Sequence, residues 1–150
     1  MAPKNRQGIS LEDRMGIYDV LGEYVWALDS GDVEGVVNVF TADGRAMDTG
    51  GNVFEGSDGI RDFVTKFTTR PEFKGRQHYV EHLKIDPADG GGWVVTSYWT
   101  VLQWHADTGE REIVVNGYSY DTCVQVDGKW LIKERLLYYW NSEQLVWQGK

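Results

Sequence analysis

Three long stretches of strand-like sequence in the C-terminal half most strongly constrain the fold. They are rich in aromatic and β-branched residues and cover residues 93–105, 112–126 and 130–140. Short turn signals separate them, at Asp107-Thr108-Gly109 and at Asp127-Gly128. Strands joined by such short turns pair antiparallel, because parallel pairing needs a long crossover. The sequence therefore predicts an antiparallel meander as the centre of the fold.

The N-terminal half is typical of helices. Ser10 can cap a helix that stops at Gly31, and Asp32 can cap a second, shorter helix. A third helix is expected from Ser57 until shortly before Pro71, since helices avoid the residue that precedes a proline.

Shorter strands are expected between these helices and the meander. Residues 45–48 and 52–55 predict a hairpin around Gly50-Gly51, and Asp43-Gly44 predicts a turn before it. Residues 76–85 predict a further strand. Helices followed by antiparallel strands are typical of an α+β domain.

We therefore expect a cone-shaped α+β barrel, with three N-terminal helices packed on a curved, mostly antiparallel sheet. Residues 10–141 would form this single domain, with a loose tail at 1–9 and a C-terminal extension at 142–150. A bent sheet over helices leaves a pocket in which a small molecule can bind.

Charge and composition narrow the class of partner. The net charge of −8 disfavours nucleic acid and anionic membranes, which attract basic surfaces. Cys123 is the only cysteine, which excludes an internal disulfide and fits a cytoplasmic protein. No stretch has the length of apolar sequence that a membrane span needs, and residues 1–10 lack the apolar centre of a signal peptide.

Asp29 is the functional candidate that the helical pattern singles out. It continues a stripe with steps of three or four residues, whose other members are Leu11, Met15, Tyr18, Gly22 and Val25. A carboxylate on a core-facing stripe at a helix C-terminus needs a partner. We expect His78 to be that partner and the two to form a general acid/base site. From the residues alone, a helix-end aspartate and a separate core histidine remain the alternative.

Tyr24 and His82 are further candidates. Tyr24 could polarise a carbonyl or protonate a leaving hydroxyl, although on an ideal helix it does not share a face with Asp29. His82 lies about 13 Å from His78 on an extended strand, too far to share a metal ion. Strict alternation would bury Lys84, so a bulge is expected there, and His82 could line the pocket as a second donor.

The strand at 112–126 offers a choice of faces. Asp121 alternates with Gly117, Ser119 and Cys123 on one face, whereas Asn116 and Tyr118 fall on the other. One of these faces must point inward, so Asp121, Asn116 and Tyr118 are all candidates for substrate binding. A structural hydrogen bond is the alternative for Asp121. No cluster of His, Cys or carboxylates has the spacing of a metal site, so a metal-free site without a cofactor is expected.

Six short motifs occur in a distinctive order. They are Tyr24-x4-Asp29-x2-Asp32, Val39-Phe40-Thr41-Ala42-Asp43-Gly44, Phe54-Glu55-Gly56, His78-Tyr79-x2-His82-Leu83-Lys84-Ile85, Gly117-x3-Asp121 and Asp127-Gly128-Lys129-Trp130-Leu131-Ile132. Over about residues 10–140, this order resembles the nuclear-transport-factor-2-like superfamily. Within it, the chain is most similar to the SnoaL-like branch, which includes scytalone dehydratase, hexachlorocyclohexane dehydrochlorinase and bile-acid 7α-dehydratase.

The resemblance implies a catalytic dyad. In that branch an Asp near the end of the first helix pairs with a His on the first long strand, and Asp29 and His78 match those positions. Tyr24 matches a tyrosine of the bile-acid enzyme, whereas His82 stands where the dehydrochlorinase has an asparagine. Relatives assemble as trimers or dimers through the open sheet face, which implies a homo-oligomer here.

The leading hypothesis is a cofactor-independent lyase or isomerase. It would eliminate water by proton abstraction from a cyclic, polyketide-like or steroid-like small molecule. One alternative is a non-catalytic ligand-binding or assembly subunit of the same fold. Another is a polyketide cyclase or an epoxide hydrolase; the latter needs an Asp-Arg-Asp cluster on the sheet, and residues 93–103 contain neither Asp nor Arg.

Overall fold

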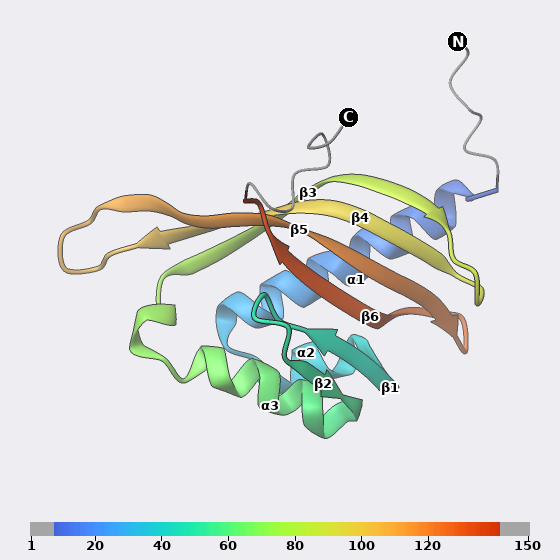
Figure 1. Ribbon diagram of the computed structural model, residues 1–150, viewed down its shortest axis with the longest axis horizontal. Helices are drawn as coiled ribbons and strands as arrows, with labels where there is room; N and C mark the ends of the chain where they lie inside the picture. Colours follow the sequence, from blue (N-terminus) through green and yellow to red (C-terminus); the bar gives the residue numbers. More distant parts are fainter. Residues whose placement is uncertain (1–7, 142–150) are drawn as a thin grey trace, which may run out of the picture.

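The computed structural model describes residues 8–141 and places helices on one side of a strongly curved sheet (Figure 1). The helical elements are α1 (Leu11–Ser30), α2 (Val33–Asn38), α3 (Gly56–Thr68) and the short 3-10 helix η1 (Pro71–Phe73). The strands are β1 (Phe40–Met47), β2 (Val53–Glu55), β3 (Arg76–Pro87), β4 (Trp93–Trp104), β5 (Arg111–Val126) and β6 (Lys129–Tyr139). The predicted α+β fold class is confirmed.

The predicted ends of α1 are confirmed. The Ser10 hydroxyl accepts a hydrogen bond from the backbone N–H of Asp13 at 3.0 Å, which satisfies a free donor of the first turn. Gly31 ends the helix in the left-handed conformation, with φ 74°, which glycine adopts without steric cost. These two ends place Asp29 in the last turn of α1.

The six strands form one mixed sheet in the order β2-β1-β6-β5-β4-β3. All neighbouring pairs are antiparallel except β1 and β6, which run parallel. The expected turn at Asp43-Gly44 is wrong, because both residues lie inside β1. The register between β1 and β6 shifts between Phe40 and Arg45, and this irregularity accommodates the Asp-Gly pair.

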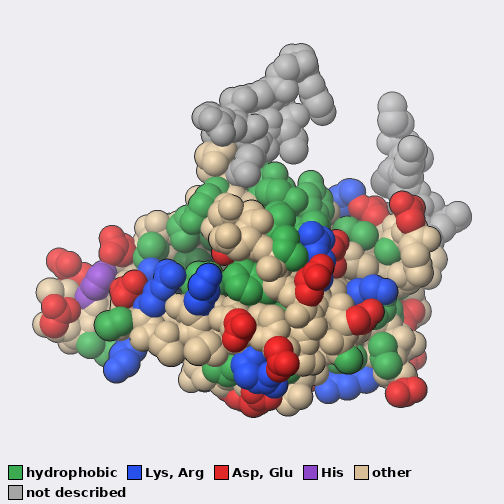
Figure 2. All heavy atoms as spheres, turned by 60° about the horizontal axis from the view of Figure 1, so that its bottom comes forward, with side chains coloured by type: hydrophobic (Ala, Val, Ile, Leu, Met, Phe, Trp, Pro, Cys, Tyr) green, Lys and Arg blue, Asp and Glu red, His purple; other side chains and the backbone are tan. Residues whose placement is uncertain are grey.

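The core lies between the helices and the concave face of the sheet. Its fully buried members come from every layer and include Ile17, Val36, Ile60, Val95 and Ile132. Helix α1 crosses the sheet in Figure 1 and contacts β3 and β6, whereas α3 lies beside β1 and β2. Figure 2 brings forward the lower side of that view, where acidic and basic side chains are interspersed among polar atoms.

The chain ends fall largely outside the described residues. The predicted C-terminal extension, 142–150, lies outside them, as do residues 1–7 of the predicted tail. Ile9 is described and packs against the core, which differs from the loose tail predicted for this residue. Among residues 8–141, no helix is long and apolar enough to cross a membrane.

Gly117 allows Trp99 to pack on the concave face of the sheet. A Cβ at this position would lie 2.2 Å from the Trp99 ring and 2.1 Å from the Tyr138 carbonyl oxygen. The Trp99 indole N–H donates to the Tyr118 carbonyl at 2.9 Å, so the ring cannot move without losing that bond.

Gly117→Ala is therefore expected to lower the free energy of unfolding by about 1–3 kcal/mol, measured by urea denaturation. Gly22→Ala is the matched control, because a Cβ there meets nothing within 4 Å inside a helix. It should stabilise the protein by about 0.5–1 kcal/mol. Equal stability of Gly117→Ala and wild type would contradict the packing described here.

Candidate active site

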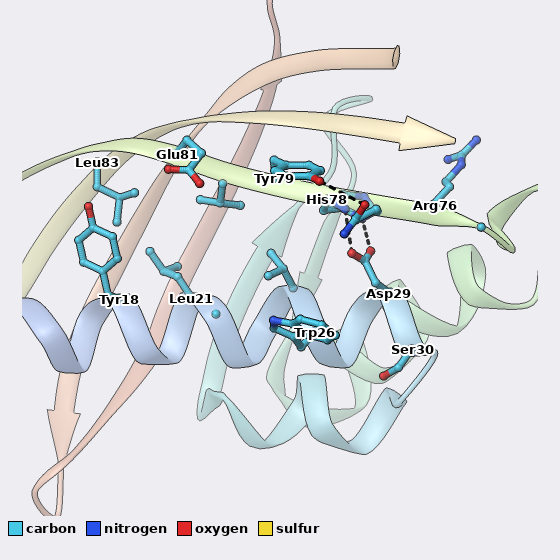
Figure 3. Close-up of a pocket in the computed structure, with 15 residues that line it drawn as sticks. Tyr18, Leu21, Trp26, Asp29, Ser30, Arg76, His78, Tyr79, Glu81 and Leu83 are labelled. Carbon is cyan, nitrogen blue, oxygen red and sulfur yellow. Dashed lines mark hydrogen bonds and ion pairs between the residues drawn. The ribbon is translucent and has the colours of Figure 1, made fainter. Parts of the chain in front are cut away.

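Asp29 and His78 meet where the end of α1 approaches the start of β3 (Figure 3). The Asp29 Oδ1 atom lies 2.5 Å from the His78 Nδ1 atom. Its other oxygen, Oδ2, accepts a hydrogen bond from the backbone N–H of His78 at 2.8 Å. One carboxylate therefore holds both the ring and the backbone of His78, which fixes the position and the orientation of the imidazole.

The carboxylate also determines which ring nitrogen is free. An ionised carboxylate can only accept hydrogen bonds, so Nδ1 of His78 carries the proton in this contact. The Nε2 atom has no hydrogen-bond partner among residues 8–141 and is left as a proton acceptor. The Phe73 ring lies against the imidazole, with 5.9 Å between ring centroids. The side chains of His78 and Asp29 are 19% and 17% exposed, so a ligand can reach them.

A groove of about 610 Å³ runs between α1 and β3 beside the pair. The predicted stripe of α1 lines it through Tyr18, Gly22, Val25 and Asp29 (Figure 3). The expectation that this stripe faces the core is wrong. The core-facing stripe is the adjacent one, which includes Ile17, Val20, Leu21, Tyr24 and Leu28. Both faces of the helix are apolar, so periodicity alone could not choose between them.

A second space of about 130 Å³ lies inside the protein, between the helices and the concave face of the sheet. Leu28, Phe63, Phe67, Trp99 and Val101 supply much of its apolar wall. Four residues line both spaces: Val25, Arg76, His78 and Val80. His78 therefore belongs to the wall between the groove and the interior cavity.

Tyr24 also lines the interior cavity but does not line the groove. It is 3% exposed, and burial raises the pKa of its hydroxyl, an effect that Arg135 partly offsets. The Arg135 guanidinium lies over the Tyr24 ring, 4.3 Å from its centroid. Tyr24 and Asp29 thus face different spaces, as their helical spacing predicts, and His78 is one of the four residues that line both spaces.

Asp121 is buried behind the cavity wall. It is fully buried, accepts a hydrogen bond from the Arg135 Nη1 atom at 2.8 Å, and accepts another from the Ser119 hydroxyl at 3.0 Å. Burial raises the pKa of Asp121, and Arg135 lowers it in part. Of the two faces that the sequence left open, the one that carries Asp121 points inward. Asp121 itself does not line the cavity, whereas Arg135 does.

Arg135 is the residue that the sequence analysis missed. It is 2% exposed on β6 and lies opposite Asp121 of β5. A two-residue turn at Asp127-Gly128 with regular pairing would put Glu134 opposite Asp121. A register shift between Thr122 and Cys123 moves the pairing by one residue and brings Arg135 inward. The sequence did contain a signal for this ion pair, because Arg135 lies only one position from the residue that regular pairing would place opposite Asp121.

His82, Asn116 and Tyr118 lie away from the Asp29–His78 pair. The register between β3 and β4 shifts between Glu81 and Lys84, where the predicted bulge is observed and His82 adopts a φ of 59°. The bulge turns His82 to the outer face, where its ring lies 6.0 Å from that of Tyr98. The expectation that His82 lines the pocket with His78 is therefore wrong.

The pairing of β4 with β5 places Asn116 and Tyr118 on the outer face as well. They lie opposite Thr100 and Tyr98, whereas the inner face carries Gly117 opposite Trp99. Tyr118 joins an outer aromatic cluster and stacks on Tyr138 at 5.2 Å. Neither residue lines the groove or the interior cavity. Within residues 8–141, no group of three or more His, Cys, Asp or Glu side chains has the arrangement of a metal site.

A helical layer on a curved, six-stranded, mostly antiparallel sheet is a fold that the chain shares with solved structures described as cystatin-like and as nuclear-transport-factor-2-like. Residues 10–136 match the SnoaL-like domain family. The chain belongs to that family. A search of curated proteins gave no match.

Solved structures share the fold. ActVI-ORFA from Streptomyces coelicolor is 25% identical, with a TM-score of 0.75 over 84% of this chain and 96% of that one. Aln2 from a Streptomyces species is 21% identical, with a TM-score of 0.75 over 87% and 93%. A Novosphingobium aromaticivorans protein, provisionally described as a scytalone dehydratase, is 24% identical, with a TM-score of 0.71 over 85% and 83%.

Proposed function

We propose that this protein is a cofactor-independent lyase or isomerase that removes a proton from a small cyclic ketone and eliminates water. The observation that carries the proposal is the pair of hydrogen bonds between His78 and the Asp29 carboxylate, one from the ring Nδ1 atom and one from the backbone N–H. A histidine held in this way presents an unprotonated Nε2 atom as a general base. The paired carboxylate would also stabilise the imidazolium that forms.

The proposed reaction balances without an added oxidant or reductant. His78 Nε2 takes the proton next to a carbonyl, and the electrons of the broken C–H bond form an enolate. The enolate then collapses, the C–O bond to the β-hydroxyl breaks, and the hydroxyl leaves as water with the proton returned by His78 or donated by Tyr24. Burial raises the pKa of Tyr24, so it holds its proton and can act as a donor.

The cavity walls suggest where a substrate lies. The interior cavity of about 130 Å³ is close to the size that holds one benzene ring, about 150 Å³. The groove of about 610 Å³ could take the remaining rings of a polycyclic molecule. We therefore propose polyketide-like or steroid-like compounds as the substrate class, with one ring held beside His78.

The test is a panel of cyclic β-hydroxy ketones incubated with the wild-type protein and followed by mass spectrometry. We expect loss of water from members that carry a hydrogen on the α-carbon, which lies between the carbonyl carbon and the hydroxyl-bearing carbon. Matched members in which two methyl groups replace the hydrogens of this α-carbon should bind and remain intact, because they have no proton for His78 to remove. Binding of the whole panel without loss of water would contradict the proposal and favour the non-catalytic binding subunit.

Assembly is a separate proposal. The outer face of the sheet carries an aromatic cluster of Tyr98, Tyr118, Tyr120, Tyr138 and Trp140. All four of its tyrosines are exposed or half-buried, and exposed aromatic patches are typical of subunit interfaces. We propose that the protein forms a homodimer or homotrimer through this face.

A further inference from the structure

The Arg135 guanidinium has one hydrogen-bond donor, Nε, that no described neighbour accepts from. Its side chain is 2% exposed and lines the interior cavity. Nη1 donates to Asp121, yet Nε is buried and has no hydrogen-bond partner among residues 8–141. Buried donors are almost always paired in folded proteins, so an unpaired one in a cavity wall is a reason to look for a ligand atom.

The surroundings of Arg135 restrict which part of it a ligand can meet. The Tyr24 ring covers one side of the guanidinium at 4.3 Å, and Asp121 occupies one edge. Asp121 is held in place by the Ser119 hydroxyl, which lies 3.0 Å from the Ser97 hydroxyl. The guanidinium is therefore oriented by a buried network, in which the Nε donor has no partner among residues 8–141.

Among the described residues that line the cavity there is one carboxylate, and its oxygens are already engaged in hydrogen bonds. This carboxylate is Asp48, whose Oδ1 atom accepts bonds from the backbone N–H groups of Gly50 and Asn52, each at 2.9 Å. Arg76 and His78 also line the cavity, as do three residues with hydroxyl groups, Tyr24, Thr49 and Tyr139. A ligand that enters is therefore met by two arginines and a histidine, together with hydroxyl groups and apolar side chains.

We propose that Arg135 anchors an anionic oxygen of the ligand in the interior cavity, a phenolate or an enolate on a ring of about the size of benzene. Asp121 is the positioning residue that keeps the guanidinium in place. The inference deepens the proposed elimination and in that respect rests on it: the oxygen that becomes negative when His78 removes a proton is the oxygen that Arg135 holds. It also names the substrate class more narrowly, as rings that carry an acidic or enolisable oxygen.

The probes are 4-nitrophenol and its uncharged isostere 4-nitrotoluene, with binding measured by titration calorimetry. The ionised form of 4-nitrophenol is coloured, so its absorbance reports the ionisation of the bound molecule. Wild type is expected to bind the phenolate and to keep it ionised at a pH where the free phenol is mostly protonated. The pKa of the bound phenol would then lie below that of the free phenol.

The variant is the double substitution Asp121→Leu with Arg135→Met, which removes both buried charges together and leaves the volume similar. It should bind the phenolate at least about tenfold more weakly than wild type, because a hydrogen bond to a charged group is lost. Binding of 4-nitrotoluene should be unchanged. Arg61→Met, which removes an arginine that lines neither space, should bind both probes as wild type does.

Three results would overturn the inference. They are absence of phenolate binding to wild type, equal phenolate binding to the double variant, and an equal loss of both probes in that variant, which would assign the effect to packing. The proposed elimination is tested separately. Phenolate binding without any turnover of β-hydroxy ketones would leave the Arg135 anchor standing and reject the lyase.

Discussion

Replacing His78 by glutamine is expected to lower kcat for the elimination by about 10²–10⁴-fold, with a much smaller change in KM. Glutamine fills similar space but cannot accept a proton at neutral pH, so the general base is lost and the cavity wall is retained. Asp29→Asn should lower kcat over a similar range. The amide can donate to Nδ1, and that favours the tautomer in which Nε2 carries the proton.

His105→Gln is the matched control for this prediction. His105 lies beside the β4–β5 turn, where it pairs with Glu112 at 2.8 Å, and it lines neither the groove nor the interior cavity. Its substitution should leave kcat and KM unchanged. Full turnover by His78→Gln, with the fold intact by circular dichroism, would reject the proposed role of the pair.

The second large effect concerns the ion pair between Asp121 and Arg135. Arg135→Met is expected to lower the free energy of unfolding by about 3–5 kcal/mol, because Asp121 then remains buried without its cation. The double variant Asp121→Leu with Arg135→Met should recover most of that loss, since neither charge is left alone. Urea denaturation of the two variants measures the difference, and equal stabilities would contradict it.

The pH dependence of Arg135→Met follows from Asp121. Burial raises the pKa of Asp121 above its ordinary value of 3.8, and Arg135 is the largest influence that lowers it. Without Arg135, the folded state binds a proton at Asp121 more tightly than the unfolded state does. The stability of Arg135→Met relative to the double variant should therefore rise as the pH falls from neutral through that raised pKa toward 3.8. A constant difference between them would show that Asp121 is not the cause.

Arg61→Met provides the surface comparison. Arg61 pairs with Glu34 and Asp58 on the outside of the helices, and all three side chains are well exposed. Solvent screens such pairs, so this substitution should change the stability little.

The fold could be predicted largely because local signals agreed with one another. Helix α1 begins with a Ser10 cap and ends at Gly31, and the meander follows turn residues such as Asp127-Gly128. Those signals depend on nearby residues, and the observed bounds lie close to the expected ones. The parallel pairing of β1 with β6 could not be predicted in this way, because it joins segments almost ninety residues apart.

The site could be predicted only in part, and irregular strand pairing explains most of the difference. Asp29 and His78 were expected to pair, and the structure places them in contact. The bulge after Glu81 turns His82 outward, and the shift near Cys123 turns Arg135 inward. Each shift of one residue exchanges the two faces of a strand, so regular alternation gives the wrong face for both residues beyond the shift.

The most direct test of the central claim is the tautomer of His78, read from the ring nitrogen resonances in an ¹⁵N–¹H NMR spectrum recorded where the imidazole is neutral. Comparison with His78→Gln identifies the signals. We expect a protonated Nδ1 and an unprotonated Nε2 in wild type, and the reverse in Asp29→Asn. A protonated Nε2 in wild type, or the same tautomer in wild type and in Asp29→Asn, would contradict this. Either result would mean that Asp29 does not keep the Nε2 atom of His78 free to accept a proton.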